Sequence, residues 1–513
     1  MTQEIGIHGG TILNSSVPQG IYGFTVNNGK FTQVFTDEFA FKKYVERKGI
    51  KTFNLGKRCL TPGLVDSHTL ASLMGRFAAV ASLAGTTLDQ AKVLVKQAVT
   101  TGPADNNWVQ VKHWSPSSQP LTMTDLDTIS TGVPIIVIGA SLHGALVNRA
   151  GLAKITADGA ANVKDHIDTN TGLVKAKAFE WWLKTYRPSP KSYADALLAY
   201  EDELLSYGVT TAHDMLVQHQ EQLDAYATLT REGKLRLRWR LYVTEIELMK
   251  NAKKMADLGV PIMGMKVFID GAYGMRTAAQ DRDHAYPDGS TGLLLMSSKE
   301  ILEVARQVYE HGCRHVAAHC IGFAACHTYI EAAKLVRESI FTNDIKLRAQ
   351  HFETANERMM HECHKYGIHL SMNAHFSEDV VTYADIMPVH EHINPLANAA
   401  ARLGDKLVLG SDSMAPRGML GEAKYAIFPP QDHQKLGAQF NNIIAYMSRN
   451  AAKLTNDHKL YGTIAPGMAA DFVIFDTMPR KADDFETMQA IQVWVGGTQV
   501  YSQPQRTEAA ANG

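Results

Sequence analysis

Cysteine is scarce in this chain, and the marks of a secreted or membrane-bound protein are missing. There are five cysteines among 513 residues, scattered and odd in number. This pattern is typical of reduced thiols in a cytoplasm rather than of a disulfide framework. The chain also lacks a run of about 18 apolar residues that could cross a membrane. Its first residues have neither a charged segment nor a long apolar core, so we expect no signal peptide.

Neither sign of charge is in excess. Lysine and arginine together number 51, and aspartate and glutamate together number 52. A protein that binds a polyanion usually carries a basic field, so we expect no nucleic-acid partner. Hydrophobic residues make up 45% of the chain, which is ordinary for a globular protein. A chain of this length predicts one large domain with a smaller one.

Short β-type runs separated by glycine turns occupy both ends of the chain. Residues 1–62 contain several such runs, and Asn-Asn-Gly-Lys at 27–30 predicts a hairpin turn. Residues 464–513 contain two more runs and then a polar tail, which we expect to be disordered. The two ends therefore predict one small β-sandwich to which both termini contribute.

The middle of the chain alternates apolar β-type runs with helical segments, which is typical of parallel βα units. We predict eight barrel strands, at 63–68, 208–214, 237–245, 263–270, 314–320, 347–353, 367–373 and 406–412. This count predicts an α/β fold, a TIM-type (β/α)8 barrel over residues 63–463. A long segment at about 85–205, with a further strand at 133–141, is interpreted as a lobe inserted over the barrel mouth.

Polar side chains that could bind a metal lie at the C-terminal ends of five of these strands. They are Asp66, His68, Lys266, Asp270, His319, His351 and Asp412. Catalytic groups of such barrels sit at this end of the strands. Imidazoles and carboxylates are the usual nitrogen and oxygen ligands of zinc, and a lysine can join them if it is neutral or carboxylated. The ensemble predicts a metal site. His319, Cys320, Cys326 and His327 are also close in sequence, but their spacing matches no standard structural zinc site.

Several longer motifs carry a resemblance to a known family. They are "LTPGLVDSHT" (60–69), "GMKVFIDGAYGMRTA" (264–278), "VAAHCIGFAA" (316–325), "LVLGSDSMAP" (407–416) and "GTIAPGMAADFVIFD" (462–476). With these motifs the chain resembles the metal-dependent amidohydrolase superfamily, in particular its amidohydrolase-3 branch, which includes N-substituted formamide deformylase-like proteins. The resemblance runs nearly end to end.

The resemblance implies a metal-dependent hydrolase of a small molecule and a set of ligands for its metal. The implied ligands are His68, Lys266, His319, His351 and Asp412, with Lys266 as a candidate carboxylated lysine that bridges two ions. It also implies a homodimer, by analogy alone. Four positions depart from the family pattern: Leu70, Phe323, Gln350 and, on a loose alignment, Lys175.

Leu70 stands where the family has the second histidine of its first-strand pair. Leucine offers no lone pair, so the metal site that uses this pair is incomplete. His319 and His351, with a carboxylated Lys266, would still form the other site. Three protein ligands with one open position are the usual pattern of catalytic zinc. We therefore expect one divalent ion, with zinc favoured.

Three further residues receive candidate catalytic roles. Asp412 would act as general base on the water and then return the proton to the leaving group. His143, in the inserted lobe, either donates to the developing oxyanion or is a surface histidine that fixes the lobe. Arg276 either orients a substrate carboxylate or pairs with Asp270. Phe323, in place of a carboxylate, would make the pocket floor apolar.

Three functions remain open at this point. The first is a one-metal hydrolase of an amide-type, non-peptide C–N bond. The second is a non-hydrolytic enzyme on the same scaffold, such as an isomerase, hydratase or decarboxylase. The third is a catalytically inactive relative that binds a small molecule or serves regulation. Metal analysis would distinguish them, because the hydrolase needs an ion to activate its water.

Overall fold

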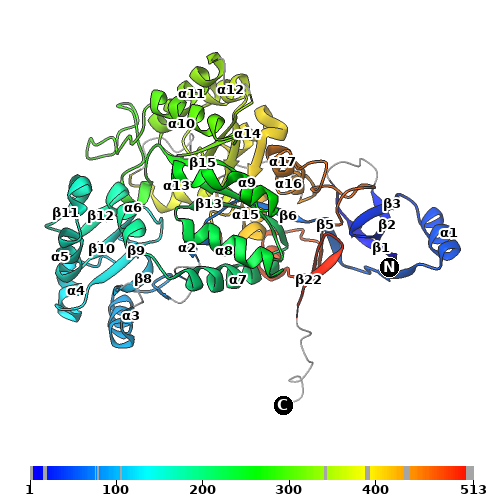
Figure 1. Ribbon diagram of the computed structural model, residues 1–513, viewed down its shortest axis with the longest axis horizontal. Coiled ribbons are helices and arrows are strands. Elements are labelled where there is room, and N and C mark those ends of the chain that lie inside the picture. The colour runs from blue at the N-terminus through cyan, green and yellow to red at the C-terminus, as the bar shows by residue number, and fades with distance from the viewer. Residues whose placement is uncertain are drawn as a thin grey trace.

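The computed structural model describes residues 4–14, 20–74, 77, 80–103, 107–339, 344–386, 393–431 and 440–503. The polar tail predicted after residue 503 lies outside them. Figure 1 shows three parts of the molecule: a terminal sheet, a central barrel and a lobe beside the barrel. No helix in the described ranges is long and apolar enough to cross a membrane.

Eight parallel strands form the barrel, and each corresponds to a strand that the sequence predicts. They are β6 (Leu64–Thr69), β13 (Val209–Val217), β14 (Arg238–Val243), β15 (Ile262–Phe268), β16 (His315–Cys320), β17 (Lys346–His351), β18 (His369–Met372) and β19 (Leu407–Leu409). The last strand returns to the first: Ser67 Oγ donates to Leu409 O over 2.7 Å. The Asp412 backbone N–H donates to His68 O over 2.8 Å. The predicted α/β fold with a TIM-type barrel is therefore confirmed.

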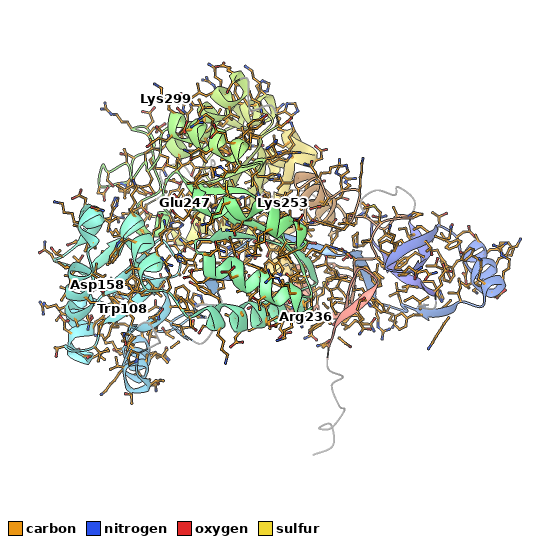
Figure 2. All side chains as sticks on the ribbon, in the orientation of Figure 1. Trp108, Asp158, Arg236, Glu247, Lys253 and Lys299 are labelled. Carbon is orange, nitrogen blue, oxygen red and sulfur yellow. The ribbon has the colours of Figure 1, made fainter. Side chains whose placement is uncertain are left out.

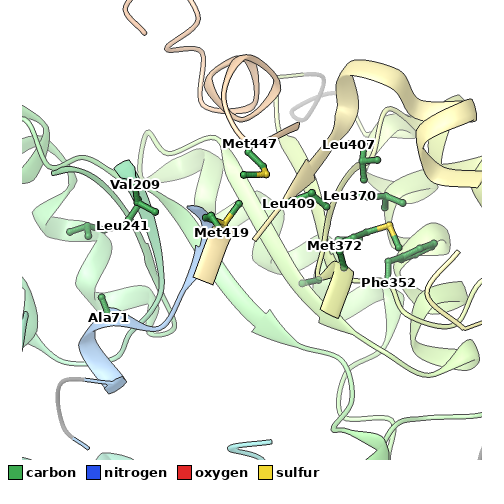
Figure 3. Packing of buried hydrophobic residues seen from close by; sticks show 14 of the residues in the cluster. Ala71, Val209, Leu241, Phe352, Leu370, Met372, Leu407, Leu409, Met419 and Met447 are labelled. Atoms are coloured by element: carbon green, nitrogen blue, oxygen red, sulfur yellow. The ribbon is translucent and has the colours of Figure 1, made fainter. Parts of the chain in front are cut away.

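The barrel core lies between the strands and the surrounding helices. Apolar strand residues such as Val209, Leu241 and Leu370 pack with Met419 and Met447 in one continuous core (Figure 3). The surrounding helices are α2 (Ala71–Met74), α7 (Pro190–Ser206), α8 (Gln220–Arg231), α9 (Ala252–Asp257), α10 (Ser298–Glu310), α11 (Phe323–Glu338), α12 (Glu357–Tyr366), α13 (Asp379–Thr382), α14 (Leu396–Leu403), α15 (Gly418–Ile427), α16 (Phe440–Tyr446) and α17 (Arg449–Leu454).

Helix α10 illustrates why these segments are helical. Ser297 caps it, because its hydroxyl accepts the backbone N–H of Glu300, and the Glu300 side chain bonds back in a capping box. Ile301, Ala305 and Val308 then recur on one face and are buried. The apolar face of this helix packs on the barrel.

The inserted lobe has a sheet of its own. Its strands are β7 (Ala81–Ser82), β8 (Val109–Trp114), β9 (Ile135–Gly139), β10 (Gly144–Val147), β11 (Ile167–Asp168) and β12 (Leu173–Lys175), with helices α3 (Leu88–Thr101), α4 (Met123–Ile129), α5 (Arg149–Ala157) and α6 (Ala176–Thr185). Trp108, which Figure 2 labels in the lobe, and Trp182 are fully buried in its core. Helix α7 packs into the barrel core instead, although the predicted lobe extends to about residue 205.

Strands from both termini form one further sheet. They are β1 (Ile5–Ile12), β2 (Ile21–Asn27), β3 (Lys30–Phe35), β4 (Lys51–Asn54), β5 (Cys59–Pro62), β20 (Phe472–Phe475), β21 (Ala490–Val495) and β22 (Thr498–Ser502), with helices α1 (Glu38–Lys48) and α18 (Ala482–Thr487). Antiparallel pairing of β20 with β5 joins the two ends. The predicted hairpin is present, with Asn28 and Gly29 both at positive φ. A sandwich of two separate layers stays a prediction.

Candidate metal centre

The first and last barrel strands are fixed to each other at the point where the candidate ligands begin. Asp66 accepts three hydrogen bonds, from the backbone N–H groups of His68 and Ser411 and from the Ser411 hydroxyl. Burial raises the pKa of Asp66 to about 7. Two of these bonds hold backbone N–H groups and the third holds the Ser411 side chain, so Asp66 is a positioning residue for the ends of β6 and β19.

His68, His351 and Asp412 come together at the barrel mouth. Their candidate ligand atoms all lie within 4.8 Å of one another, and all three side chains are buried. His68 Nε2 lies 3.2 Å from Asp412 Oδ1. Both His351 (φ 65°) and Asp412 (φ 53°) have left-handed backbone conformations, which few non-glycine residues adopt. Such strained backbone conformations cluster at functional sites in general.

Protonation states favour these groups as ligands. The Nδ1–H of His351 donates to Asn373 Oδ1 over 2.8 Å, which leaves the Nε2 lone pair free for an ion. Burial, followed by the charge of Lys266, lowers the pKa of His68 well below its usual value. Burial and the charge of His68 do the same to the pKa of His351. Both imidazoles are therefore neutral, as a metal requires.

His319 lies beside this group but uses one nitrogen elsewhere. Its Nε2–H donates to the carbonyl of Gly271 over 2.9 Å, so only Nδ1 keeps a lone pair. The rings of His319 and His351 are 4.5 Å apart between centroids. Among the described residues, the set that satisfies metal distances is His68, His351 and Asp412, whereas the sequence interpretation pairs His319 and His351 with Lys266.

Lys266 is buried at the edge of the same site. Its Nζ lies 5.2 Å from the centre of the Phe268 ring. Burial lowers the pKa of Lys266 to about 7, against the opposing attraction of Asp412. Burial in turn raises the pKa of Asp412 to about 7. An amine with this pKa is partly neutral near pH 7.

The inserted lobe brings His143 to the site through the turn between β9 and β10. Its ring centroid lies 4.6 Å from that of His319. Burial, with the charge of Lys266, lowers the pKa of His143 to about 4. His143 is thus a half-buried, neutral imidazole at the barrel mouth.

Arg276 does not belong to this site. Its guanidinium is exposed and bonds to Asp288 over 2.9 Å. Asp270 instead accepts backbone N–H groups of Ala279, Ile321 and Gly322, so the expected Arg276–Asp270 pair is wrong. The reason is local: Arg276 has a left-handed backbone (φ 50°) that follows a short helical turn.

The four departures from the family pattern occupy different surroundings. Leu70 lines the pocket above the site, as a second histidine would. Gln350 is buried, and its Oε1 has no hydrogen-bond partner in the described structure. Phe323 stacks on His284 at 4.1 Å and is not among the described pocket-lining residues, so the expected apolar floor is wrong. Lys175 lines a separate cavity on the lobe.

Two pockets meet at the site, and His143, His319, His351 and Asp412 line both. The narrow pocket has a volume of about 50 Å³ and apolar walls, which include Leu73, Leu142, Phe179, Leu183, Leu216 and Phe268. The acidic pocket has a volume of about 180 Å³ and is lined by Tyr273, Glu353, Phe376, Glu378, Asp379 and Tyr383. A substrate at the metal centre would extend into one or both.

Sequence reasoning missed the acidic pocket and the polar layer beneath the site. Glu353 follows β17, whereas Asp379 and Tyr383 both follow β18, and the sequence does not show that these segments meet. In the barrel interior, Arg348 is fully buried and bonds to His213, Tyr242 and Ser371. This layer could have been predicted from the polar residues inside the predicted barrel strands, such as His213 and Arg348.

Comparisons with known proteins agree with this geometry. The chain is 24% identical over 460 residues to "Putative amidohydrolase YtcJ" of Bacillus subtilis (strain 168), covering 84% of this chain and 86% of that protein. It is 24% identical over 548 residues to "Protein LONG AFTER FAR-RED 3" of Arabidopsis thaliana, covering 97% and 91%.

A solved structure has the same fold. An uncharacterized metal-dependent hydrolase from Pyrococcus furiosus superposes with a TM-score of 0.72 at 20% identity, covering 93% of this chain and 99% of that one. The model of the amidohydrolase family, in its amidohydrolase-3 form, matches residues 51–501. The chain therefore belongs to the amidohydrolase family.

Proposed function

We propose that this protein hydrolyses an amide-type, non-peptide C–N bond of a small molecule with one divalent ion, zinc being favoured. The observation that carries the proposal is the convergence of His68, His351 and Asp412 within 4.8 Å at the mouth of an amidohydrolase barrel. Two imidazoles and a carboxylate form a usual three-ligand set for catalytic zinc. When bound, such an ion acidifies a water molecule and polarises a carbonyl group.

The chain's own groups supply the proton transfers. Asp412 would help to hold the ion and would accept a proton from the attacking water as general base. The water oxygen forms a bond to the carbonyl carbon. Asp412 then gives the proton to the leaving nitrogen as the C–N bond breaks, so the products are a carboxylic acid and an amine.

His143 and Lys266 complete the proposed site. A neutral His143 ring still has one N–H, which can donate to the oxyanion that develops on the carbonyl oxygen. Lys266, with a pKa of about 7 through burial, is partly neutral and can therefore react with carbon dioxide to form a carboxylated lysine. Its carboxylate would then be a further oxygen ligand for the ion.

Metal content tests the proposal first. Protein purified without chelator should contain about one equivalent of zinc by elemental analysis, the usual occupancy of a three-ligand site. His351→Ala and Asp412→Asn should each lower this content. His327→Ala is the matched control, because His327 is an exposed histidine of α11 with a single distant partner, Glu331. A metal-free protein, or equal losses in all three variants, would contradict the site.

Amine release from a panel of N-acyl amines tests the reaction. Asp412→Asn should lower kcat by about a hundredfold or more, the usual effect of losing a general base. His143→Gln should lower kcat with a smaller change in KM if His143 donates to the oxyanion. A folded, metal-loaded protein that converts such compounds without releasing an amine would instead support isomerase, hydratase or decarboxylase chemistry.

A further inference from the structure

The acidic pocket contains a buried carboxyl group that lies beside a second acid and beside no lysine or arginine of the described lining. Glu353 is 1% exposed, and among the described residues its carboxyl group interacts with the neighbouring carboxyl group of Asp379 and receives no hydrogen bond from an N–H or hydroxyl donor. Glu353 lines the pocket that adjoins the candidate metal centre. Two buried acids without N–H or hydroxyl donors are unfavourable in general, so such a pair in a pocket favours a ligand that donates hydrogen bonds.

The charge of the lining points in the same direction. Besides Asp412, which the proposed function assigns to the ion, Glu353, Glu378 and Asp379 line the pocket, and its described lining contains no lysine or arginine. Four histidines also line the pocket: His375 already bonds to the buried carboxylate of Glu422, and His143, His319 and His351 lie at the candidate metal centre. A pocket of this composition attracts a cation.

Metal binding does not account for this second acid cluster. Within the described residues, the group that meets metal distances is His68, His351 and Asp412, and neither Glu353 nor Asp379 belongs to it. Aromatic rings also contribute to the wall: Tyr273, Phe376 and Tyr383 line the pocket. Rings beside carboxylates suit an organic cation, which gains cation–π attraction as well as charge pairing.

The two pockets meet at the site, so one molecule can reach both. His351 lines both pockets, and Phe376 of the acidic pocket stacks on the His351 ring at 5.4 Å. The volume of the acidic pocket, about 180 Å³, is several times the roughly 30 Å³ that one water molecule occupies. It can therefore hold an organic ammonium or amidinium group.

We propose that the acidic pocket binds the cationic end of the substrate, with Glu353 and Asp379 as its recognition groups and the aromatic rings as its walls. This assignment of a substrate rests on the proposed function. The substrate class is then an N-acyl amine whose amine part carries a second, protonated nitrogen. The acyl carbonyl lies at the metal centre and the acyl chain enters the narrow apolar pocket.

Binding of a simple cation tests the pocket without relying on hydrolysis. Benzamidine is charged at neutral pH, and benzamide is its neutral counterpart of nearly equal shape. Isothermal titration calorimetry should give wild-type protein a Kd at least tenfold lower for benzamidine. Glu353→Gln and Asp379→Asn should each remove most of this preference. Glu303→Gln is the control, because Glu303 is an exposed carboxylate of α10 that pairs with Arg306.

Circular dichroism and thermal melting establish that each variant is folded. Equal affinity for benzamidine and benzamide in wild-type protein would overturn the proposal. A preference that survives in folded Glu353→Gln and Asp379→Asn proteins would overturn it too. If one variant fails to fold, the other decides the outcome.

Hydrolysis then separates this proposal from the proposed function. N-acetyl-1,5-diaminopentane and N-hexylacetamide differ at one end, where the first has an ammonium group and the second a methyl group. Wild-type kcat/KM should be at least tenfold higher for the cationic amide, and Glu353→Gln should lower only that value. Hydrolysis of both amides at equal rates overturns the pocket assignment. Glu353-dependent binding of benzamidine without hydrolysis of either amide counts against the proposed function alone.

Discussion

At the scale of single residues, Leu70 removes a possible metal ligand, and a backbone hydrogen bond still holds the end of its strand. The Leu70 backbone N–H donates to Ser413 Oγ over 2.8 Å, which ties the end of β6 to the residue after Asp412. Its side chain lines the narrow pocket and is 9% exposed. Leu70 therefore faces the same pocket as His68, His351 and Asp412, and its side chain offers no lone pair to an ion.

Replacing Leu70 with histidine should restore a ligand. We expect Leu70→His to raise zinc content from about one to about two equivalents, because His68 and the new imidazole could hold one ion while other groups hold a second. Elemental analysis of the purified variant measures this. Leu70→Met, which keeps an apolar side chain, is the control. Unchanged zinc in a folded Leu70→His protein would mean that residue 70 does not face the metal.

Lys266 offers a test through pH, in metal-free protein. Burial lowers the pKa of Lys266 to about 7, whereas an unfolded lysine keeps its proton to about 10.4. Between these values the unfolded state binds more protons. The stability that Lys266 contributes is therefore fully present above the unfolded pKa and is lost as pH falls towards 7.

The free energy of unfolding of wild type relative to Lys266→Met should therefore increase by roughly 1 kcal/mol per pH unit between pH 7.5 and 9. Urea denaturation of chelator-treated protein at both pH values measures it. Lys253→Met is the control, since Lys253 is an exposed helix residue paired with Asp257. A difference that stays constant with pH would show that Lys266 titrates like a solvated lysine.

At the scale of elements, the barrel closes where β19 lies against β6 with almost no space between them. A side chain at Gly410 would place its Cβ 2.5 Å from His68 Cβ and 2.6 Å from His68 N. Only glycine permits this approach, and the approach carries Asp412 to His68. Strand packing, rather than the chemistry of the site, thus requires glycine at position 410, two residues before Asp412.

Gly410→Ala should therefore separate β19 from β6. We expect a loss of roughly 2 kcal/mol or more in the free energy of unfolding, as overpacking in a core costs. Zinc content should fall as well, because His68 and Asp412 move apart. Gly132→Ala is the matched control, since no atom lies within 4 Å of its built Cβ. Wild-type stability with full metal in Gly410→Ala would contradict this closure.

Most elements could be predicted from local pattern. Each of the eight barrel strands is an apolar run with a polar end, and helix α10 has both its cap and its apolar face in the sequence. The limits of the lobe were harder to predict, because the helical pattern of α7 does not show whether the helix packs on the lobe or on the barrel. Only its burial of Tyr200 and Leu204 against the barrel assigns it there.

At the scale of the whole molecule, an ion pair fastens the terminal sheet to the barrel. Arg238 of β14 donates to Asp471 through Nε (2.7 Å) and Nη2 (3.1 Å), just before β20. Asp471 also accepts the backbone N–H of Gly496 over 2.6 Å. Its side chain is 1% exposed, so it depends on these donors.

Arg238→Met should leave Asp471 buried with a reduced set of donors. We expect a loss of roughly 3 kcal/mol, the usual consequence of removing one partner of a buried pair. Urea denaturation measures the change. Arg306→Met should change stability by less than about 1 kcal/mol, because its partners are exposed. Equal effects of the two substitutions would mean that the sheet does not depend on this contact.

The sequence by itself determined the barrel, the contribution of both termini to one sheet and the strand ends that carry possible ligands, because these follow from local periodicity and from motifs. The tertiary structure alone decided which of those groups converge. Gly271 takes one nitrogen of His319, Arg276 turns to Asp288, and Asp412 meets His68 and His351. Distances among residues hundreds of positions apart depend on how the strands close, and no local pattern encodes them.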